Sequence, residues 1–417
     1  MLPFPDAPYR FFPPKPNAFI RFLARETNRR IILPGPQHRI RNLEVFGMER
    51  LEQFTARRGV RLLFVPNHPT HSDPQIVTEV LRRCGLPAVF MAAYDVFLRG
   101  KFQAWLMQRT GSFSVDRDAG DTQSLKTAIQ VLAEGHAPLT IFPEGNVHLA
   151  NDRPASFQEG AAFIGIRAQK QLGDAAEVFA VPIAIKTTHL HDPRPGVHRR
   201  LAGIADALGT QFDAAAPVLR EVQRIGLLAV ERNLKQRGYP VPSPQDATDQ
   251  QVQRSAEIIL SGLEQKMGLP GKPDTGLQER VRRVRSAVHD VRADPAREID
   301  HPAASGWADE AMLVLRLLGY AGNYLAENPT IDRFAETSER LAEDLYSRAC
   351  RPFGQRHAYA MILPPVSIRC VLEKNARSRT AAQDLTRGFE AAVQGGLDVI
   401  NGRNPHYGGR QLEHVDA

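Results

Sequence analysis

The sequence contains few cysteines and no long apolar run, and each absence excludes a class of protein. Its three cysteines, Cys84, Cys350 and Cys370, lie far apart with no paired spacing. We therefore expect reduced thiols in a cytosolic compartment, and neither a disulfide framework nor a zinc site. No run of about 18 or more apolar residues occurs, so we expect no transmembrane helix. The N-terminal segment is rich in proline and lacks the apolar core of a signal peptide, so none is expected.

The remaining composition is typical of a globular, basic protein. Of the 417 residues, 42% are apolar and 24% are charged, which excludes a disordered chain. The net charge of +7 favours an anionic partner such as a phospholipid surface, an acyl carrier or a nucleic acid. No aromatic stacking motif, P-loop, dinucleotide fingerprint or Gly-x-Ser-x-Gly elbow accompanies the basic segments, so we expect no nucleic-acid partner. The pattern specifies no oligomeric state.

The stretch at residues 62–74 gathers the residues best suited to chemistry. Four apolar residues predict a short buried strand, Pro66 ends it, and an Asn-His-Pro turn leads into a helix. His68 and Asp73 are separated by four residues, so the first turn of that helix can fold the carboxylate back onto the imidazole. Asp73 would then fix the tautomer of the ring and leave its other nitrogen free to take a proton from a hydroxyl. For the pair alone, the alternative is a loop histidine beside an aspartate that caps the helix.

Three further blocks follow in order, at residues 111–117, 142–145 and 181–185. Together the four blocks resemble those of the glycerolipid acyltransferase family typified by 1-acylglycerol-3-phosphate acyltransferase, over residues 40–190 and again over residues 357–402. The resemblance implies transfer of a fatty acyl group from an acyl thioester to the hydroxyl of a lysophospholipid or related glycerolipid, in phospholipid synthesis or remodelling. The donor would be acyl-CoA or an acyl carrier protein. The enzyme would need no metal or redox cofactor, and it would be cytoplasmic and peripherally associated with the membrane.

The resemblance also implies roles for individual residues. His68 would be the base that deprotonates the acceptor, with Asp73 holding it in place. Arg117 would bind the acceptor phosphate through its planar fork of donors, and its alternative is a surface salt bridge with a neighbouring aspartate. Glu144 and Gly145 would shape the acceptor site. The alternative for Glu144 is a buried acid that only accepts bonds from backbone amides.

The fourth block and one local departure complete the comparison. Val181 and Pro182 would line the acyl or donor groove, although periodicity alone predicts only a core strand there. After the third block the family usually continues with Thr-Arg-Ser, whose arginine makes a second phosphate contact, whereas this chain has Asn-Val-His at residues 146–148. Three nearby cations are candidates to replace that arginine: His148, Arg153 and Lys186. Otherwise the acceptor would be a different lysolipid, or another amphiphilic alcohol or amine.

Strand-like and helix-like segments alternate in the first half of the chain, which predicts a layered α/β domain with a largely parallel sheet and flanking helices. Strands are expected at residues 60–65, 87–92, 113–115, 139–142, 178–185 and 358–366. Helices are expected at residues 74–83, 97–110, 123–133, 157–170, 217–236, 249–267, 277–292, 309–346 and 379–400, with an interruption of 309–346 near Gly319 to Pro329. The expected organisation is a Pro-rich and basic amphipathic segment (1–40), an acyltransferase domain (41–197), an all-helical insertion (198–356) and a final strand and helix (357–417). A separate C-terminal helical domain is the alternative.

The segment at residues 19–33 mixes apolar residues with four arginines. As a basic amphipathic helix it would lie in a membrane interface, with Phe19, Phe22 and Leu23 below the headgroups. The alternative is a helix packed on the catalytic domain with its arginines solvated.

Two other functions fit parts of the pattern. A lipid-binding protein whose transferase site has decayed at the third block would keep the fold without the chemistry. A metallohydrolase would use His68, His71 and Asp73 as ligands, but no histidine follows Asp73 and no further ligands appear at a convincing spacing. Such an enzyme would bind zinc and lose activity with a chelator.

Overall fold

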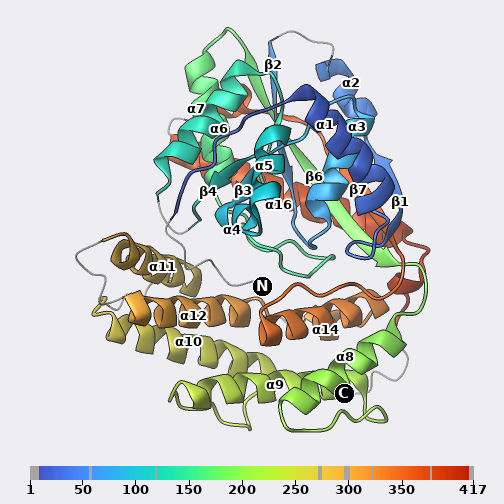
Figure 1. Ribbon diagram of the computed structural model, residues 1–417, viewed down its shortest axis with the longest axis vertical. Coiled ribbons are helices and arrows are strands. Elements are labelled where there is room, and N and C mark those ends of the chain that lie inside the picture. Colours follow the sequence, from blue (N-terminus) through green and yellow to red (C-terminus); the bar gives the residue numbers. More distant parts are fainter. Residues whose placement is uncertain are drawn as a thin grey trace. The chain divides into compact units, whose positions relative to one another are not determined.

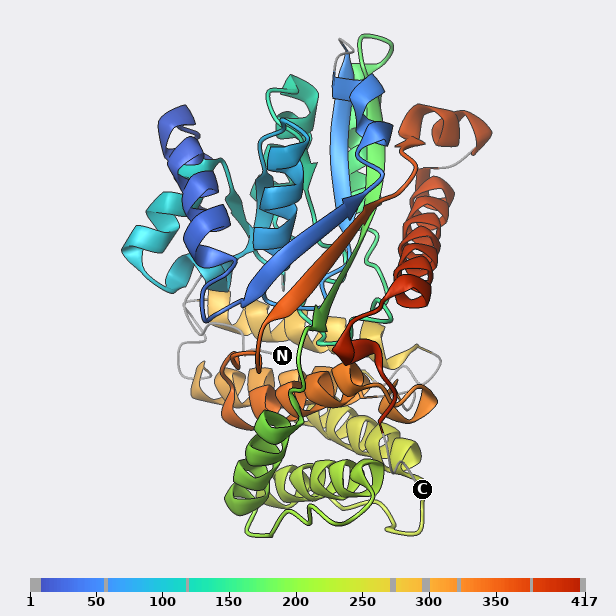
Figure 2. The ribbon, with the colours of Figure 1, turned by 90° about the vertical axis from the view of Figure 1, so that its right-hand side faces the viewer.

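The computed structural model describes residues 9–55, 59–117, 120–270, 275–294, 301–320, 324–375 and 378–412. The first eight residues of the expected Pro-rich segment lie outside this description. The chain divides into two compact units, and the elements of both are drawn in Figures 1 and 2. The sheet unit comprises Tyr9–His191 and Gly354–Gly409, and the helical unit is built on Asp192–Phe353. The helical unit is therefore an insertion between two segments of the sheet unit.

One eight-stranded sheet lies in the described part of the sheet unit. Its strands are β1 (Ile40–Phe46), β2 (Val60–Pro66), β3 (Val89–Ala93), β4 (Phe113–Val115), β5 (Leu139–Thr140), β6 (Glu177–His189), β7 (Arg356–Ile362) and β8 (Val366–Ser367). Their order is β1-β7-β6-β2-β5-β3-β4, and β8 pairs with β6. From β6 to β4 the strands run parallel, whereas β7 runs antiparallel to β6 and pairs in parallel with β1. With its flanking helices, this largely parallel sheet confirms the predicted α/β class.

The helices of the sheet unit differ from expectation at several places, one of which is the unexpected helix at Glu49–Thr55. They are α1 (Ala18–Thr27), the π-helix η1 (Asn28–Ile32), α2 (Glu49–Thr55), α3 (Asp73–Arg83), α4 (Tyr94–Leu98), α5 (Lys101–Thr110), α6 (Thr122–Glu134), α7 (Gly160–Leu172), α15 (Ile368–Lys374), α16 (Ser378–Arg403) and the 3₁₀-helix η3 (Tyr407–Gly409). The single helix expected at residues 97–110 is wrong, because Gly100 is extended and separates α4 from α5. The short α15 was not expected, because seven residues carry too little periodicity to be recognised.

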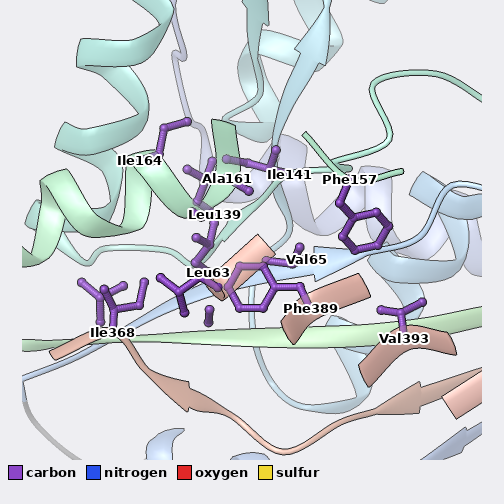
Figure 3. Packing of buried hydrophobic residues seen from close by; sticks show 14 of the residues in the cluster. Leu63, Val65, Leu139, Ile141, Phe157, Ala161, Ile164, Ile368, Phe389 and Val393 are labelled. Carbon is purple, nitrogen blue, oxygen red and sulfur yellow. The ribbon is translucent and has the colours of Figure 1, made fainter. Parts of the chain in front are cut away.

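Alternate residues of β2 supply the cores of the two faces of the sheet. Leu63 and Val65 lie in one apolar cluster with residues of α6, α7 and α16, whereas Leu62 and Phe64 lie in a second cluster with residues of α3. Figure 3 shows the first cluster, in which side chains from β2, β5, α7 and α16 come together. In Figure 2 the red helix α16 lies on one side of the sheet and the dark blue α1 on the other. β2 is apolar along most of its length because both of its faces are covered.

The helical unit contains α8 (Arg194–Ala207), α9 (Val218–Gln236), α10 (Thr248–Lys266), α11 (Leu277–Ala293), α12 (His301–Leu318), α13 (Tyr324–Glu327) and α14 (Ile331–Tyr346). Residues of α10, α11 and α12 share one apolar cluster, to which α11 contributes valines at helical spacing. α8 was not expected, because a proline usually interrupts a helical pattern. In α8 the proline stands in the first turn, where its missing N–H costs nothing. None of the helices in the described residues is long and apolar enough to span a membrane.

Candidate active site

The turn that carries His68 begins where β2 ends, between β6 and β5. Asn67 is fully buried and fastens this turn to β6. Its Nδ2 donates to the carbonyl of Ile185 at 3.0 Å, and its Oδ1 accepts from the N–H of Ile185 at 2.7 Å. An unpaired buried amide is costly, so these two bonds fix the point at which the chain leaves the sheet.

Asp73 is the first residue of α3 and is fully buried. Its Oδ2 accepts from Nδ1 of His68 at 2.8 Å and from the N–H of Thr70 at 2.7 Å. Its Oδ1 accepts from the hydroxyl of Thr70 at 2.8 Å. These bonds hold the carboxylate in one orientation, and they place the proton of the His68 ring on Nδ1.

The ring of His68 is supported on one face and partly exposed. It stacks on Phe142 with 4.2 Å between ring centroids and 24° between the ring planes. The side chain is 17% exposed. Its Nε2 makes no hydrogen bond with any residue that the structure describes. Because Nδ1 carries the proton, Nε2 has the lone pair and can take a proton from a hydroxyl that reaches it.

Glu144 braces the main chain beside His68. Its Oε1 accepts from the N–H of His68 at 2.6 Å, and its Oε2 accepts from the N–H of Ala155 at 3.0 Å. Burial, with a smaller contribution from the charge of Asp73, raises the pKa of Glu144 to about 8 against the opposing effect of the two backbone bonds. Glu144 contacts no arginine among the described residues. In this arrangement both carboxylate oxygens of Glu144 accept from backbone amides.

Arg117 follows β4, and its guanidinium donates to groups of Gly145, Asn146 and Asp95. Nη1 donates to the carbonyl of Gly145 at 2.7 Å and to Oδ1 of Asn146 at 2.6 Å, while Nη2 donates to Oδ1 of Asp95 at 3.0 Å. Gly145 has a φ of +74°, a conformation that favours glycine and that turns its carbonyl towards Arg117. Asn146, at the first position of the departure from the family pattern, thus takes up a donor of Arg117 without adding a cation.

The other candidate residues lie in or near β6. Val181 and Pro182 are buried in this strand, where they pair with β2 in the interior of the sheet. Lys186, further along β6, forms a buried ion pair with Asp152. His148 approaches His68 through its backbone, whose N–H lies 3.4 Å from the carbonyl of His68. The structure thus joins His68, Asp73 and Glu144 directly, and it places Val181 and Pro182 in the sheet core.

Sequence reasoning missed the partners of Arg117 and of Asp73. Asp95 lies in α4 directly after β3, and Arg117 follows β4, which is the parallel neighbour of β3. Because neighbouring parallel strands end at the same edge of a sheet, the positions of Asp95 and Arg117 directly after β3 and β4 predict that they lie close together. Thr70 lies inside the His68–Asp73 spacing, and threonine side chains bond to nearby groups in turns. The sequence therefore contains a signal for both partners, Asp95 and Thr70.

The same turn carries His68, His71 and Asp73, the residues expected as ligands if the protein were a metallohydrolase. No three histidine, cysteine, aspartate or glutamate side chains come together as metal ligands in the residues that the structure describes. Nδ1 of His68 is already bonded to Asp73.

The protein is of the α/β class, and its histidine–aspartate pair at the end of a parallel strand is an arrangement suited to general-base chemistry. In a comparison with family models, residues 42–186 match the model described as Acyltransferase. The matched segment is an acyltransferase domain, and the match supports an acyltransferase of the glycerolipid acyltransferase family. Comparison with curated proteins found no match to the chain.

Proposed function

We propose that this acyltransferase moves a fatty acyl group from acyl-CoA or an acyl carrier protein to the hydroxyl of a lysophospholipid or related glycerolipid, in phospholipid synthesis or remodelling. The observation that carries the proposal is the bond of 2.8 Å between Nδ1 of His68 and Asp73, which leaves Nε2 open. Both residues fall within the segment that matches the acyltransferase model.

His68 acts as a general base in a direct displacement. Nε2 takes the proton of the acceptor hydroxyl while its oxygen bonds to the carbonyl carbon of the thioester. The carbon–sulfur bond then breaks, and the thiolate leaves and recovers the proton, so that the products are an ester and a free thiol. Asp73 stabilises the imidazolium that forms in between. A positioned base of this kind contributes roughly 100 to 10,000-fold to the rate.

Arg117 is the cation assigned to the acceptor phosphate. Its side chain is 20% exposed, so a headgroup can reach it. Asp95 offsets part of its charge, and Asn146 takes up one of its donors. We therefore expect the enzyme to depend less strongly on a headgroup phosphate than a site with two arginines would, because a phosphate meets only one partly compensated guanidinium.

The test is the release of free thiol from oleoyl-CoA with lysophosphatidic acid, lysophosphatidylcholine, monoacylglycerol and a long-chain alcohol as acceptors. His68→Ala is expected to lower kcat by about 1,000-fold. His136→Ala, at an exposed histidine in the turn after α6, serves as the matched control and is expected to retain full activity. If no acceptor supports His68-dependent release from oleoyl-CoA or an oleoyl-acyl carrier protein, the proposal fails and a lipid-binding role takes its place.

The proposal also places the enzyme on a membrane, through an aromatic face on α1 and α5. These two helices contact each other. α1 exposes Phe19 (67%) and Phe22 (59%), and α5 exposes Phe102 (72%) and Trp105 (41%). Single exposed apolar side chains are ordinary, but large aromatic ones on two adjoining helices mark a surface that binds an apolar partner.

Exposed cations lie close in sequence to the two helices of the aromatic face: Arg30 in η1, where it pairs with Glu26, and Arg99 at the end of α4, where it pairs with Asp95. Arg30 has a side chain that is 68% exposed, and Arg99 one that is 49% exposed. Arg21 and Arg25 are half-buried instead, and burial lowers the pKa of both. α1 thus turns its aromatic residues outward and these two arginines inward, which is the reverse of a helix packed through its apolar side. Exposed aromatics beside exposed cations fit the surface of an anionic phospholipid bilayer.

Vesicle co-sedimentation tests this face. The double variant Phe19→Ser, Phe102→Ser is expected to bind vesicles that contain phosphatidylglycerol at least about tenfold more weakly, since each phenylalanine contributes apolar area. Val399→Ser, which changes a 42% exposed apolar residue on α16, is the control and should bind as the wild type does. Equal binding by the double variant and the wild type would refute this face as the contact.

A further inference from the structure

Ser72, the residue immediately before Asp73, does not cap the helix that it precedes. It occupies the N-cap position of α3, yet its side chain makes no capping bond. Its hydroxyl lies instead between two buried side chains, 3.0 Å from Nδ1 of His38 and 2.9 Å from Nη2 of Arg356. Serine at this position usually accepts a bond from the first turn of the helix, so its use elsewhere calls for an explanation.

Arg356 is the centre of the cluster. It begins β7, is 6% exposed and lies 284 residues after Ser72 in the sequence. Its Nη2 also donates to the carbonyl of His38 at 2.8 Å, and its Nε donates to the same oxygen at 3.2 Å. Its backbone N–H donates to the carbonyl of Arg39 at 2.8 Å. Arg39 has a φ of +53°, which is uncommon for this residue type, so Arg356 also holds a strained piece of backbone in place.

The positions of the hydrogens in the cluster follow from its donors. An arginine can only donate, so the oxygen of Ser72 accepts from Arg356 and the hydroxyl hydrogen is left for Nδ1 of His38. A neutral His38 with its proton on Nε2 accepts this hydrogen through Nδ1. Burial, together with the charges of Arg356 and His71, lowers the pKa of His38 to about 4 against the opposing effect of Asp73. The cluster is therefore free of donor conflicts at neutral pH.

We infer that Arg356, Ser72 and His38 form a positioning cluster that sets the catalytic imidazole through Asp73. The inference rests on the proposed role of His68 as the base. Ser72 is covalently joined to Asp73, so holding its hydroxyl fixes the start of α3 and with it the carboxylate that orients His68. His38 and Arg356 both lie outside residues 42–186, the segment that matches the family model. Because a small displacement of a catalytic group lowers turnover strongly, the cluster should act on kcat more than on KM.

Three variants test this inference by thiol release. Ser72→Ala and His38→Leu are expected to lower kcat by about tenfold to a hundredfold, with KM for the thioester and the lysolipid changed less than about twofold. His38→Asn keeps an acceptor near the position of Nδ1 and should restore most of the lost kcat. Ser124→Ala is the matched control, because Ser124 is equally buried in α6 and its hydroxyl donates to a backbone carbonyl at 3.2 Å. Its kcat should equal that of the wild type.

A second readout separates positioning from simple stability. The proton that His68 donates to Asp73 gives its own low-field signal in proton NMR, which should weaken in Ser72→Ala and persist in Ser124→Ala. A Ser72→Ala enzyme with wild-type kcat and an unchanged signal overturns the inference, and so does one that only melts at a lower temperature. If His68→Ala itself keeps full activity, the proposed function fails first, and the two failures are thereby distinguished.

Discussion

Replacing Asp73 with asparagine separates the charge of the catalytic pair from its geometry. Asp73 accepts from His68 and from the N–H of Thr70 through Oδ2, and from the hydroxyl of Thr70 through Oδ1. In Asp73→Asn the amide oxygen can keep both bonds of Oδ2. The amide nitrogen then faces the hydroxyl of Thr70, which can rotate to accept. His68 keeps its Nδ1 proton and its orientation, so the main change is the loss of a negative charge.

The size of the effect follows from the ion pair that forms during the reaction. When Nε2 takes a proton, an imidazolium lies beside a carboxylate, with about 4 Å between the two charges; at an effective dielectric constant of about 20 their attraction is about 4 kcal/mol. Without this attraction the barrier rises by a similar amount. We therefore expect kcat of Asp73→Asn to fall by about 1,000-fold.

The assay is steady-state thiol release, combined with thermal unfolding of each variant. Asp152→Asn is the matched control, because Asp152 is also a buried aspartate in an ion pair but is bonded to Lys186. It should lose stability while its folded fraction keeps a normal kcat. If Asp73→Asn keeps kcat within about threefold of the wild type while His68→Ala is inactive, the carboxylate charge does not support the base. An equal loss of activity in both aspartate variants would also refute the reasoning.

Three further predictions concern protonation and acceptor choice. The pKa of Glu144 is raised from 4.5 to about 8, so the folded state keeps a proton that the unfolded state loses, and stability falls as pH rises across that interval. In urea unfolding from pH 5 to 8, Glu144→Gln should flatten this slope by about 1 kcal/mol per pH unit, and an unchanged slope would contradict the assignment. The pKa of His357 is lowered from 6.5 to about 4 by burial and by His406, so its stability contribution is lost as pH falls through that range. His357→Phe removes two buried ring nitrogens that lack hydrogen-bond partners among the described residues, so it should melt higher at pH 5 than the wild type, with a smaller difference at pH 8. Arg117→Lys should raise KM for lysophosphatidic acid by about tenfold and change KM for a long-chain alcohol by less than about twofold, whereas equal changes would argue against a phosphate contact.

The elements that could be predicted from the sequence are those whose signal is local. The strand at residues 113–115 and the helices at residues 217–236 and 249–267 follow from short apolar runs, helical spacing and Pro/Gly punctuation, and they appear in the structure as β4, α9 and α10. The place of β7 in the sheet could not be predicted. Its pairing with β1 and β6 joins segments far apart in the sequence, and no local pattern specifies the neighbour of a strand.

The candidate site divides in the same way. The bond between His68 and Asp73 spans five positions, so a turn and one helical residue are enough to anticipate it. The contact between Arg117 and Asp95 needs the strand order, which the sequence gives only through the topology of parallel neighbours. The contact between Ser72 and Arg356 needs the register of β7, and serine before a helix predicts an ordinary cap instead.

The register of β7 nevertheless has a simple physical origin. Side chains alternate between the faces of a strand, so Arg356 shares a face with Ala358, Ala360 and Ile362. These three apolar residues lie in the cluster that contains the buried side of α3, whereas Tyr359 and Met361 lie in the cluster on the opposite face. A shift of β7 by one residue in register would move Ala358, Ala360 and Ile362 to the opposite face of the sheet and would turn Arg356 away from Ser72. The hydrophobic alternation that specifies the sheet is therefore also what brings Arg356 to the start of α3, and the position of His68 depends on the packing of a strand at the other end of the chain.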